Sequence, residues 1–596
     1  MTANLDLSRR RLLQIMGIGA VASTGAVALA SCKADSSDTG GRGGAFVYAY
    51  DFDITAQNYN AIVQDTTLLL AAPVSDLYYP RLALRNWGTG EWQYMLAESA
   101  VWDGDVLTIT PRTGVKWSDG TDVTVDDFMG SFAERKLNVA PGSDGWPQVT
   151  SFEVVGDAIA VTFDKPYPGV EYEVLRTRIH PSSRYGEHFT TALQLIEDGV
   201  RFDDKEQQDF VSQLGNLSFD DMISCGPFVI DPDKVSDTRV TMNLHKDGLF
   251  GSQVKFNSVQ VEKASNDEAA QLMGEKKVDY ITHVLGPAER AQFEGTDGLR
   301  EFSFLDQQGV GLMLNNKSNP EFADPRVRKA LLHIIKKDEV ARIALGDGAY
   351  FIPKYMSGLS DVVSETVLSA DELAKFDPYD YDPDKATAYL EDAGWTKSGD
   401  TWQTPDGKDA EYEILAVNGW NDFDLTAQQV AEQWNAFGIK ATTKNAEEAS
   451  IWGIWPAGDF QVAVRQWGNP FTPQVAGAWQ MTWFTDNNRT SDAPGMWLDT
   501  TKVESPTYGT VDISEIYDVA RSSQDDEERN AANAKLAVIF NETLPRLPVW
   551  GFNRLSYGLE GVGVKKFTID QTLANNDIYR DNPVMIELLA GNIEAV

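Results

Sequence analysis

The chain has 596 residues, 42% of them hydrophobic, and a formal net charge of −38. The length predicts several domains with a large core, and the excess of carboxylates argues against a nucleic acid or an anionic membrane surface as partner, because both require a basic face. We interpret the acidity as that of a well-hydrated exported protein, with adaptation to salt as the alternative.

The N-terminus has the pattern of an export signal. Arg9 and Arg10 belong to a Ser-Arg-Arg-Arg-Leu-Leu run that resembles a twin-arginine motif, and an apolar run of small residues follows at 15–30. That run is too short for a comfortable membrane span. The pattern predicts a protein that folds before it is exported.

A lipid-attachment pattern comes next. The tetrapeptide Leu-Ala-Ser-Cys at 29–32 resembles a lipobox. It implies that residues 1–31 are a signal, that Cys32 is acylated, and that the protein is anchored to the outer face of the cell membrane. The alternative is a plain secretory signal with an incidental cysteine. Residues 32–44 are predicted to form a flexible tether. With Cys32 acylated, Cys225 has no disulfide partner and is expected to be a buried free thiol.

The globular part begins with a strand at 45–50, AFVYAY, and Asp51 follows its end. Residues 107–128, LTITPRTGVKWSDGTDVTVDDF, alternate as a strand does, turn at Asp-Gly, and then start a helix for which Thr124 is the cap. This pattern predicts a strand, a turn and then a helix.

Two later segments carry strong helix starts. Residues 309–332, GVGLMLNNKSNPEFADPRVRKALL, predict a short buried strand and then a helix with Asp324 as N-cap and proline in the first turn. Residues 382–395, DPDKATAYLEDAGW, predict another helix, which begins at Asp382 and ends at its glycine.

The sequence offers little catalytic chemistry. It has no Gly-x-Ser-x-Gly elbow, phosphate loop, His-Glu-x-x-His or Cys-x-x-Cys, and its five histidines are scattered. Carboxylates from Asp380 onward have an EF-hand-like spacing, but Lys385 stands where a calcium loop needs glycine. We therefore expect no metal, no cofactor and no enzyme activity. A glycosidase pair among the many carboxylates is the enzymatic alternative.

A tryptophan-rich region is the most informative candidate for binding. Residues 460–485 contain a single charged side chain, Arg465, although 23% of the whole chain is charged. Tryptophans there could be core, because they bury large areas, or could line an apolar cleft. The residues that we predict to line a cleft are Trp467, Asn469, Trp452, Trp420, Trp146 and Asp51.

Several motifs, in order along the chain, resemble family 5 extracellular solute-binding proteins, the peptide-type receptors of ABC importers. Residues 107–128 are similar to L-R-x-G-V-K-W-S-D-G-x-x-x-T-A-x-D, residues 324–331 to D-x-R-V-R-x-A-L, and residues 382–395 to D-P-x-K-A-x-x-L-L-x-x-A-G-W. The resemblance implies an α/β fold, two-lobed and periplasmic-binding-protein-like, of the large three-domain class with a hinge between the lobes.

The same resemblance implies the domain bounds. The expected parts are a first lobe from 45–84, 220–308 and 552–596, a small inserted domain at 85–219, and a second lobe at 309–551. It also implies a monomer that closes on its ligand and delivers it to an ABC permease in the membrane, with no bond made or broken.

The ligand is the open question. In peptide-binding relatives, a motif G-W-x-x-D-[YN]-x-[DE]-P carries the aspartate that pairs with the peptide amine, and this aspartate is absent from residues 466–471 here. Burying an ammonium without a carboxylate costs several kcal/mol. Either another acid takes the role or the ligand has no amine. Oligopeptide is the first expectation and oligosaccharide the second, and the scattered histidines do not support a nickel chelate. The candidate acids are Asp51, Asp53, Asp422 and Asp424.

Overall fold

The protein was analysed as a computed structural model, which describes residues 44–52, 54, 57–62, 72–138, 146–468, 474–487, 489–490 and 493–596. The predicted export signal with Arg9 and Arg10, the lipidation site Cys32 and the cleft candidate Asn469 lie outside these residues. Within them, no helix combines the length and the apolar character needed to cross a membrane.

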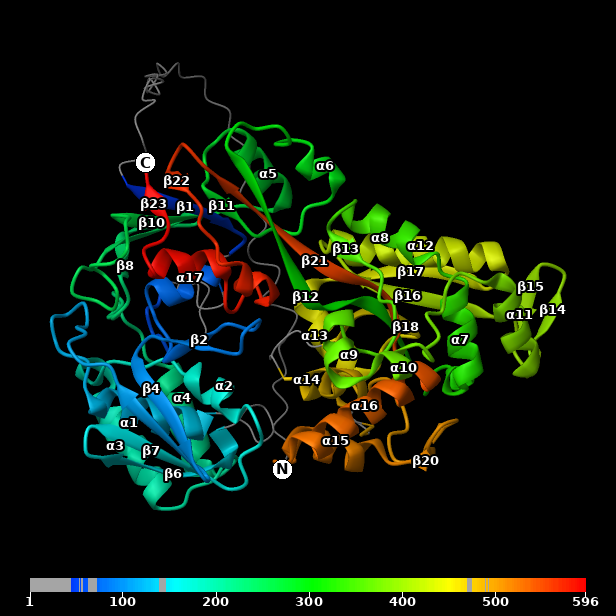
Figure 1. Cartoon of the computed structure of the whole chain (residues 1–596), viewed down its shortest axis with the longest axis horizontal. Coiled ribbons are helices and arrows are strands. Elements are labelled where there is room, and N and C mark those ends of the chain that lie inside the picture. The colour runs from blue at the N-terminus through cyan, green and yellow to red at the C-terminus, as the bar shows by residue number, and fades with distance from the viewer. Residues whose placement is uncertain are drawn as a thin grey trace, which may run out of the picture. The chain divides into compact units, whose positions relative to one another are not determined.

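One mixed sheet runs through the described part of the chain (Figure 1). Strand β1 is parallel to both of its neighbours, and β16 is also parallel to its two neighbours. Across the sheet, the strands are β17 (Lys440–Ala446), β16 (Glu411–Val417), β18 (Val462–Gly468), β12 (Leu299–Leu314), β21 (Leu547–Leu559), β11 (Tyr280–Ile281), β1 (Ala45–Tyr50), β10 (Ser258–Lys263), β9 (Arg239–Leu244) and β8 (Phe228–Ser236), while β13 (Tyr350–Phe351) also pairs with β21.

Two long antiparallel strands, β12 and β21, join the two halves of this sheet. The N-terminal half of β12 pairs with the C-terminal half of β21, and the register shifts between Leu305 and Gly309 before the pairing continues. After the shift, β12 also pairs with β18. The two strands therefore pass from one half of the sheet to the other together (Figure 1).

The short buried strand expected at 310–315 is the last part of β12, which is longer than predicted because it begins at Leu299 and ends at Leu314. The first half mixes exposed and half-buried residues with the buried Phe304, whereas Val310–Leu314 is buried throughout. An apolar run marks only the buried part of a strand, so the sequence pattern missed the exposed beginning. The lobe boundaries expected near 308 and 551 lie at the register shift, and they remain predictions.

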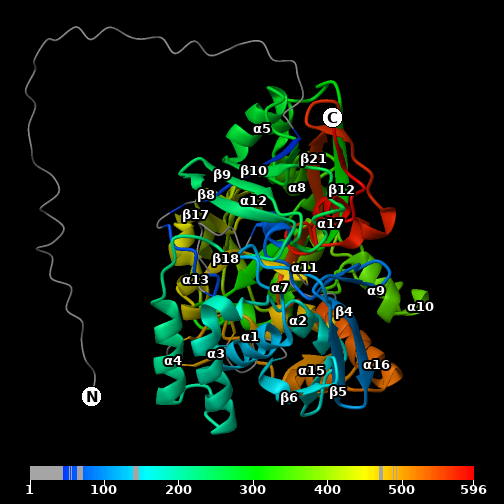
Figure 2. The ribbon, with the colours of Figure 1, turned by 90° about the vertical axis from the view of Figure 1, so that its left-hand side faces the viewer.

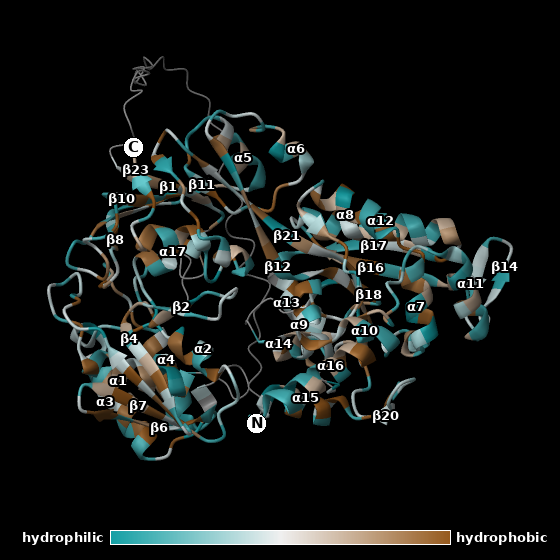
Figure 3. Ribbon diagram, viewed as in Figure 1, coloured by the Kyte–Doolittle hydropathy of each residue, from teal (hydrophilic) through white to brown (hydrophobic). Residues whose placement is uncertain are grey.

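The expected small domain at 85–219 contains its own antiparallel sheet. Its strands are β4 (Ala97–Asp103), β5 (Val106–Pro111), β7 (Ala158–Phe163) and β6 (Val149–Val155), in that order. Helices α1 (Val125–Asn138), α3 (Ser182–Glu197) and α4 (Lys205–Gly215) belong to the same region, and hydrophobic residues concentrate on α1 and the sheet (Figure 3). Helix α1 begins directly after Thr124, as predicted.

The helix starts predicted in the second half are confirmed. The Asp324 carboxylate accepts a 2.8 Å hydrogen bond from the Arg326 N–H at the start of α7 (Pro325–His333). Asp382 accepts one of 3.0 Å from the Lys385 N–H at the start of α11 (Pro383–Asp392). Both carboxylates satisfy backbone donors that have no partner inside the helix.

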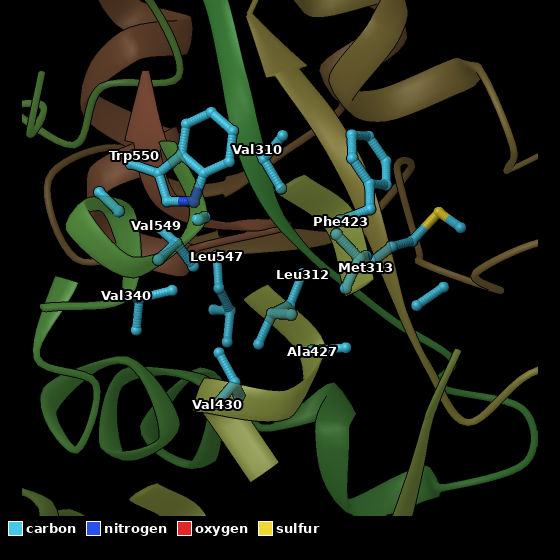
Figure 4. Close-up of a cluster of buried hydrophobic side chains, with 14 of the residues drawn as sticks. Val310, Leu312, Met313, Val340, Phe423, Ala427, Val430, Leu547, Val549 and Trp550 are labelled. Atoms are coloured by element: carbon cyan, nitrogen blue, oxygen red, sulfur yellow. The ribbon is translucent and has the colours of Figure 1, made fainter. Parts of the chain in front are cut away.

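Helices α8 (Lys337–Leu345) and α12 (Asn421–Phe437) pack on the second half of β12 and the first half of β21. Figure 4 shows the contact, which buries aliphatic side chains from all four elements, among them Val310, Leu547, Val340 and Val430. Each side chain of this kind contributes about 1.5–3 kcal/mol of transfer free energy. This core holds α8 and α12 in place, and the ends of both helices reach the site described next.

Candidate functional site

A cavity of about 1170 Å³ lies where β1, β21, α8 and α12 meet. Its walls come from segments far apart in sequence: the end of β1, the stretch that leads into α6 (Pro287–Arg290), the end of α8, the start of α12, and β21. Both predicted lobes contribute. The volume exceeds that of a typical small-molecule pocket, so it has room for a ligand of several linked units.

The cavity wall has more negative than positive side chains. The one guanidinium among the described wall residues, that of Arg554 on β21, is already paired, because its Nε lies 2.9 Å from Oδ2 of Asp306. Burial alone would lower the pKa of Arg554, but Asp306 raises it above its ordinary value, so the guanidinium keeps its charge. The carboxylates in the wall are Asp51, Glu289, Asp422, Asp424 and Glu448.

Two of these carboxylates have different surroundings. Asp424 accepts 3.0 Å hydrogen bonds from the side-chain amides of Gln428 and Asn445. Asp422, at the start of α12, accepts one of 3.1 Å from the Phe423 N–H. Burial raises the pKa of the Asp422 carboxyl, against the opposing effect of Arg554. A cationic ligand group would therefore stabilise Asp422 more than Asp424.

Two tyrosines complete the wall on the side of the first lobe. Burial, together with smaller effects of the nearby Tyr579, Asp51 and Glu448, raises the pKa of Tyr50 to about 12. Tyr579 donates to the carbonyl of Thr282 at 3.2 Å. Both phenols are neutral near pH 7, so they offer hydrogen bonds and ring faces rather than charge.

Trp420 connects the cavity to an aromatic cluster on α13 (Glu448–Ala457). Its ring centre lies 6.2 Å from that of Trp452, which lies 5.3 Å from that of Trp455. The guanidinium carbon of Arg465 lies 4.0 Å from the Trp455 ring centre, and its Nε lies 2.8 Å from Asp486. Trp452 is 54% exposed, so it extends an aromatic surface outward from the cavity wall.

Two of the residues predicted to line a cleft, Asp51 and Trp420, lie in the cavity wall, and Trp452 packs against Trp420 next to it; their role in binding stays a prediction. Trp467 does not line it: it is 1% exposed and donates from Nε1 to the Trp550 carbonyl at 2.9 Å, at the crossing of β12 and β21. Trp146 does not line it either, because it is buried in the small domain and donates to Thr177 at 2.9 Å. Both therefore serve as core in this structure.

Arg554, Tyr579 and Glu448 also line the cavity, and the sequence interpretation did not select them. Tyr579 and Arg554 lie in the C-terminal segment, where no motif was found. Tyr50 could have been found, since it directly precedes Asp51 at the end of β1. Asp422 and Asp424 were proposed only as substitutes for a missing acid, and both are in the wall.

The described residues contain no group of three or more His, Cys, Asp or Glu side chains arranged to hold a metal ion. Cys225 is free and buried, as predicted, and burial raises the pKa of its thiol.

Residues 91–489 match the family described as bacterial extracellular solute-binding proteins, family 5. The chain is 23% identical over 452 residues to the oligopeptide-binding protein OppA of Lactococcus lactis subsp. cremoris, an alignment of 68% of this chain and 71% of that protein. It is 24% identical over 409 residues to the dipeptide-binding protein of Escherichia coli, covering 63% of this chain and 70% of the relative.

Solved structures show the same fold. The periplasmic oligopeptide-binding protein of an oligopeptide ABC transporter from Thermotoga maritima superposes with a TM-score of 0.74 at 17% identity, over 93% of this chain and 100% of that chain. Its mannohexaose-bound form gives a TM-score of 0.69, also at 17% identity, over 93% and 99%. The fold is therefore the two-lobed fold that the motifs implied.

Proposed function

The chain belongs to the family 5 bacterial extracellular solute-binding proteins, and we propose that it captures an oligopeptide in the cavity between its lobes and delivers it to the permease of an ABC importer. Curated relatives are named as oligopeptide- and dipeptide-binding proteins. The observation that carries the choice of a peptide is the composition of the wall: among the described residues, five carboxylates line the cavity and the one guanidinium is neutralised by Asp306.

We propose that Asp422 accepts the peptide amine, with Asp51 on the opposite lobe as the second carboxylate. An ammonium buried beside a carboxylate gains a charge-assisted hydrogen bond that offsets part of its desolvation. Asp424 is the poorer acceptor, because two side-chain amides already occupy it. This assignment would account for the missing aspartate at residues 466–471.

The mechanism is closure around β12 and β21. A ligand that touches Asp51 on one lobe and Asp422 on the other makes both contacts only when the lobes are together. It therefore binds the closed state more tightly and shifts the population toward it. The protein makes and breaks no bond, so peptides incubated with it are expected to be recovered intact.

An oligosaccharide is the second candidate. The Thermotoga maritima neighbour has been solved with mannohexaose, and the flat faces of Trp420 and Trp452 suit sugar rings. A neutral sugar would leave the five wall carboxylates without a cationic partner, which is why we place it second.

Export and anchoring are proposed from the N-terminal pattern alone. Acylation of Cys32 would keep the protein beside its permease at the outer face of the membrane. Cells that express the chain and are fed a labelled fatty acid should yield a labelled protein, and Cys32→Ala should yield an unlabelled one. Label in the alanine variant would refute the lipobox.

The amine assignment can be tested by calorimetric titration of pooled tetrapeptides and of the same pool after N-acetylation. Wild type should bind the free-amine pool, and Asp422→Asn should weaken that binding at least about thirtyfold, because truncating a buried charge pair costs about 2–5 kcal/mol. Asp424→Asn is the matched control and should have little effect. Equal affinity for free and acetylated pools would refute the assignment.

A further inference from the structure

Outside the cavity, one loop of the small domain contacts the second lobe. The loop is 164–169, between β7 and α2 (Val170–Leu175). Its partners are Gln474 and two residues at the end of α15 (Ile513–Ser522) and just after it, Arg521 and Gln524. Helices α2 and α15 can be found in Figures 1 and 2.

Three separate contacts contribute to this junction. The guanidinium carbon of Arg521 lies 4.6 Å from the centre of the Tyr167 ring. The side-chain amide of Gln524 donates to the Pro166 carbonyl. A Cβ at Gly169 would lie 2.4 Å from Nε2 of Gln474, so the backbone of the loop packs directly on that amide.

The backbone at Gly169 is suited to this close approach. Its φ is +84°, a conformation that glycine adopts without strain and other residues rarely do. Tyr167 is 6% exposed, so the ring under Arg521 is held in place. The junction thus combines a buried ring, a close backbone approach and a side-chain hydrogen bond.

Its position separates it from ligand recognition. None of Tyr167, Arg521 and Gln524 lines the cavity. The two lobes are joined by β12 and β21. When the lobes move apart, any contact between the lobes that lies away from these strands is broken. Opening the cleft must therefore break the contacts of loop 164–169, although a ligand in the cavity does not touch them.

We propose that loop 164–169 and the pair Arg521 and Gln524 form a latch that holds the lobes closed and sets the affinity for ligand without contacting it. The proposal rests on the closure mechanism of the proposed function. Apparent affinity depends on the fraction of molecules in the binding-competent state, so the latch residues are positioning residues for capture.

The expected size of the effect follows from the contacts. A cation–π pair at a partly exposed site is worth about a two- to fivefold change in an equilibrium, and a neutral hydrogen bond is worth a similar factor. Arg521→Ala should therefore release bound peptide about two to five times faster. Arg521→Ala with Gln524→Ala should release it about tenfold faster, if the two contacts act independently.

The decisive measurement is the distance between the lobes in the ligand-free protein. Spin labels at Gln213→Cys on α4 and Glu391→Cys on α11, both exposed positions, report it in the full chain with Cys32→Ser. Arg521→Ala should move the distance distribution toward longer values at an unchanged unfolding temperature. Release of pooled tetrapeptides is the second readout.

Lys535→Ala is the matched control, because its ammonium lies 5.1 Å from the Tyr508 ring centre within the second lobe. It removes a cation from an aromatic face without affecting the junction, and should leave the distances unchanged. A longer distance in Arg521→Ala but not in Lys535→Ala supports the latch even if no tetrapeptide binds. Failure to bind tetrapeptides would count only against the peptide as ligand. The same distribution in wild type, Arg521→Ala and Lys535→Ala overturns the latch.

Discussion

Trp420 occupies the point where the cavity wall meets the aromatic cluster of α13. Its ring offers a flat apolar surface to a ligand, and buried aromatic contacts commonly dominate binding energy. We predict that Trp420→Ala weakens binding of pooled tetrapeptides about tenfold or more, measured by calorimetry. An unchanged affinity would mean that the ligand does not reach this wall.

Trp467→Ala removes a buried tryptophan that does not line the cavity, and it is the comparison for Trp420→Ala. Trp467 packs over Gly309 and hydrogen-bonds the Trp550 carbonyl, so its removal leaves a cavity at the strand crossing. We predict a loss of about 3–5 kcal/mol in the free energy of unfolding, measured by chemical denaturation. A normal stability with lost binding would restore Trp467 as a ligand contact.

Glu134 on α1 is 4% exposed. Burial raises the pKa of its carboxyl to about 7 from an ordinary value of 4.5, against a hydrogen bond from Asn138 that lowers it. Above pH 7 the folded state therefore holds a buried charge at a cost. As the pH falls from 7 to 4.5, the folded state takes up a proton before the unfolded state does, and stability increases.

Glu134→Gln should remove this pH dependence. The variant should be more stable than wild type at pH 8, by up to about 3 kcal/mol for a shift of this size, and the difference should shrink toward pH 4.5. Unfolding measured at several pH values in both proteins gives the difference directly. A constant difference across the range would show that Glu134 titrates normally.

At the scale of elements, the crossing of β12 and β21 depends on close backbone approach. A Cβ at Gly309 would lie 2.0 Å from the Trp550 carbonyl oxygen and 2.6 Å from Nε1 of Trp467. We predict that Gly309→Ala lowers the free energy of unfolding by about 1–3 kcal/mol, as overpacking does.

Gly186→Ala in α3 is the control for that substitution. A Cβ there meets nothing within 4 Å, so helix propensity alone should stabilise the variant by up to about 1 kcal/mol. Opposite signs for the two variants in denaturation are expected. Equal changes in the free energy of unfolding for the two variants would contradict the claim that a Cβ at Gly309 is crowded.

Elements with local signals were predictable, and elements defined by distant partners were not. Helices α7 and α11 begin with an aspartate cap and proline, which act within one turn. The first half of β12 has no such signal, because its pairing with β21 joins residues more than 200 positions apart. Its mixture of exposed, half-buried and buried residues also lacks the apolar run that marks a buried strand.

At the scale of the whole molecule, the motifs were enough to predict the two-lobed fold, since each one marks a local element in a fixed order. The site was only partly predictable. Asp51 and Trp420 lie directly beside β1 and α12, two elements with clear sequence patterns. Arg554 and Tyr579 lie in the C-terminal segment that returns to the first lobe, where no motif pointed to the cavity. Trp467 and Trp146 show why a tryptophan in the sequence does not by itself identify a binding site. A large aromatic side chain suits a buried core and the wall of a ligand cavity equally well.

The central claim is that the cavity takes up intact peptides through their amines. The most direct test is mass spectrometry of whatever is released on denaturation from protein purified natively out of cells grown in peptide-rich medium. We predict peptides of mixed sequence with free N-termini, one per molecule of protein. A hexose-spaced series in their place would contradict the account and make the chain an oligosaccharide receptor.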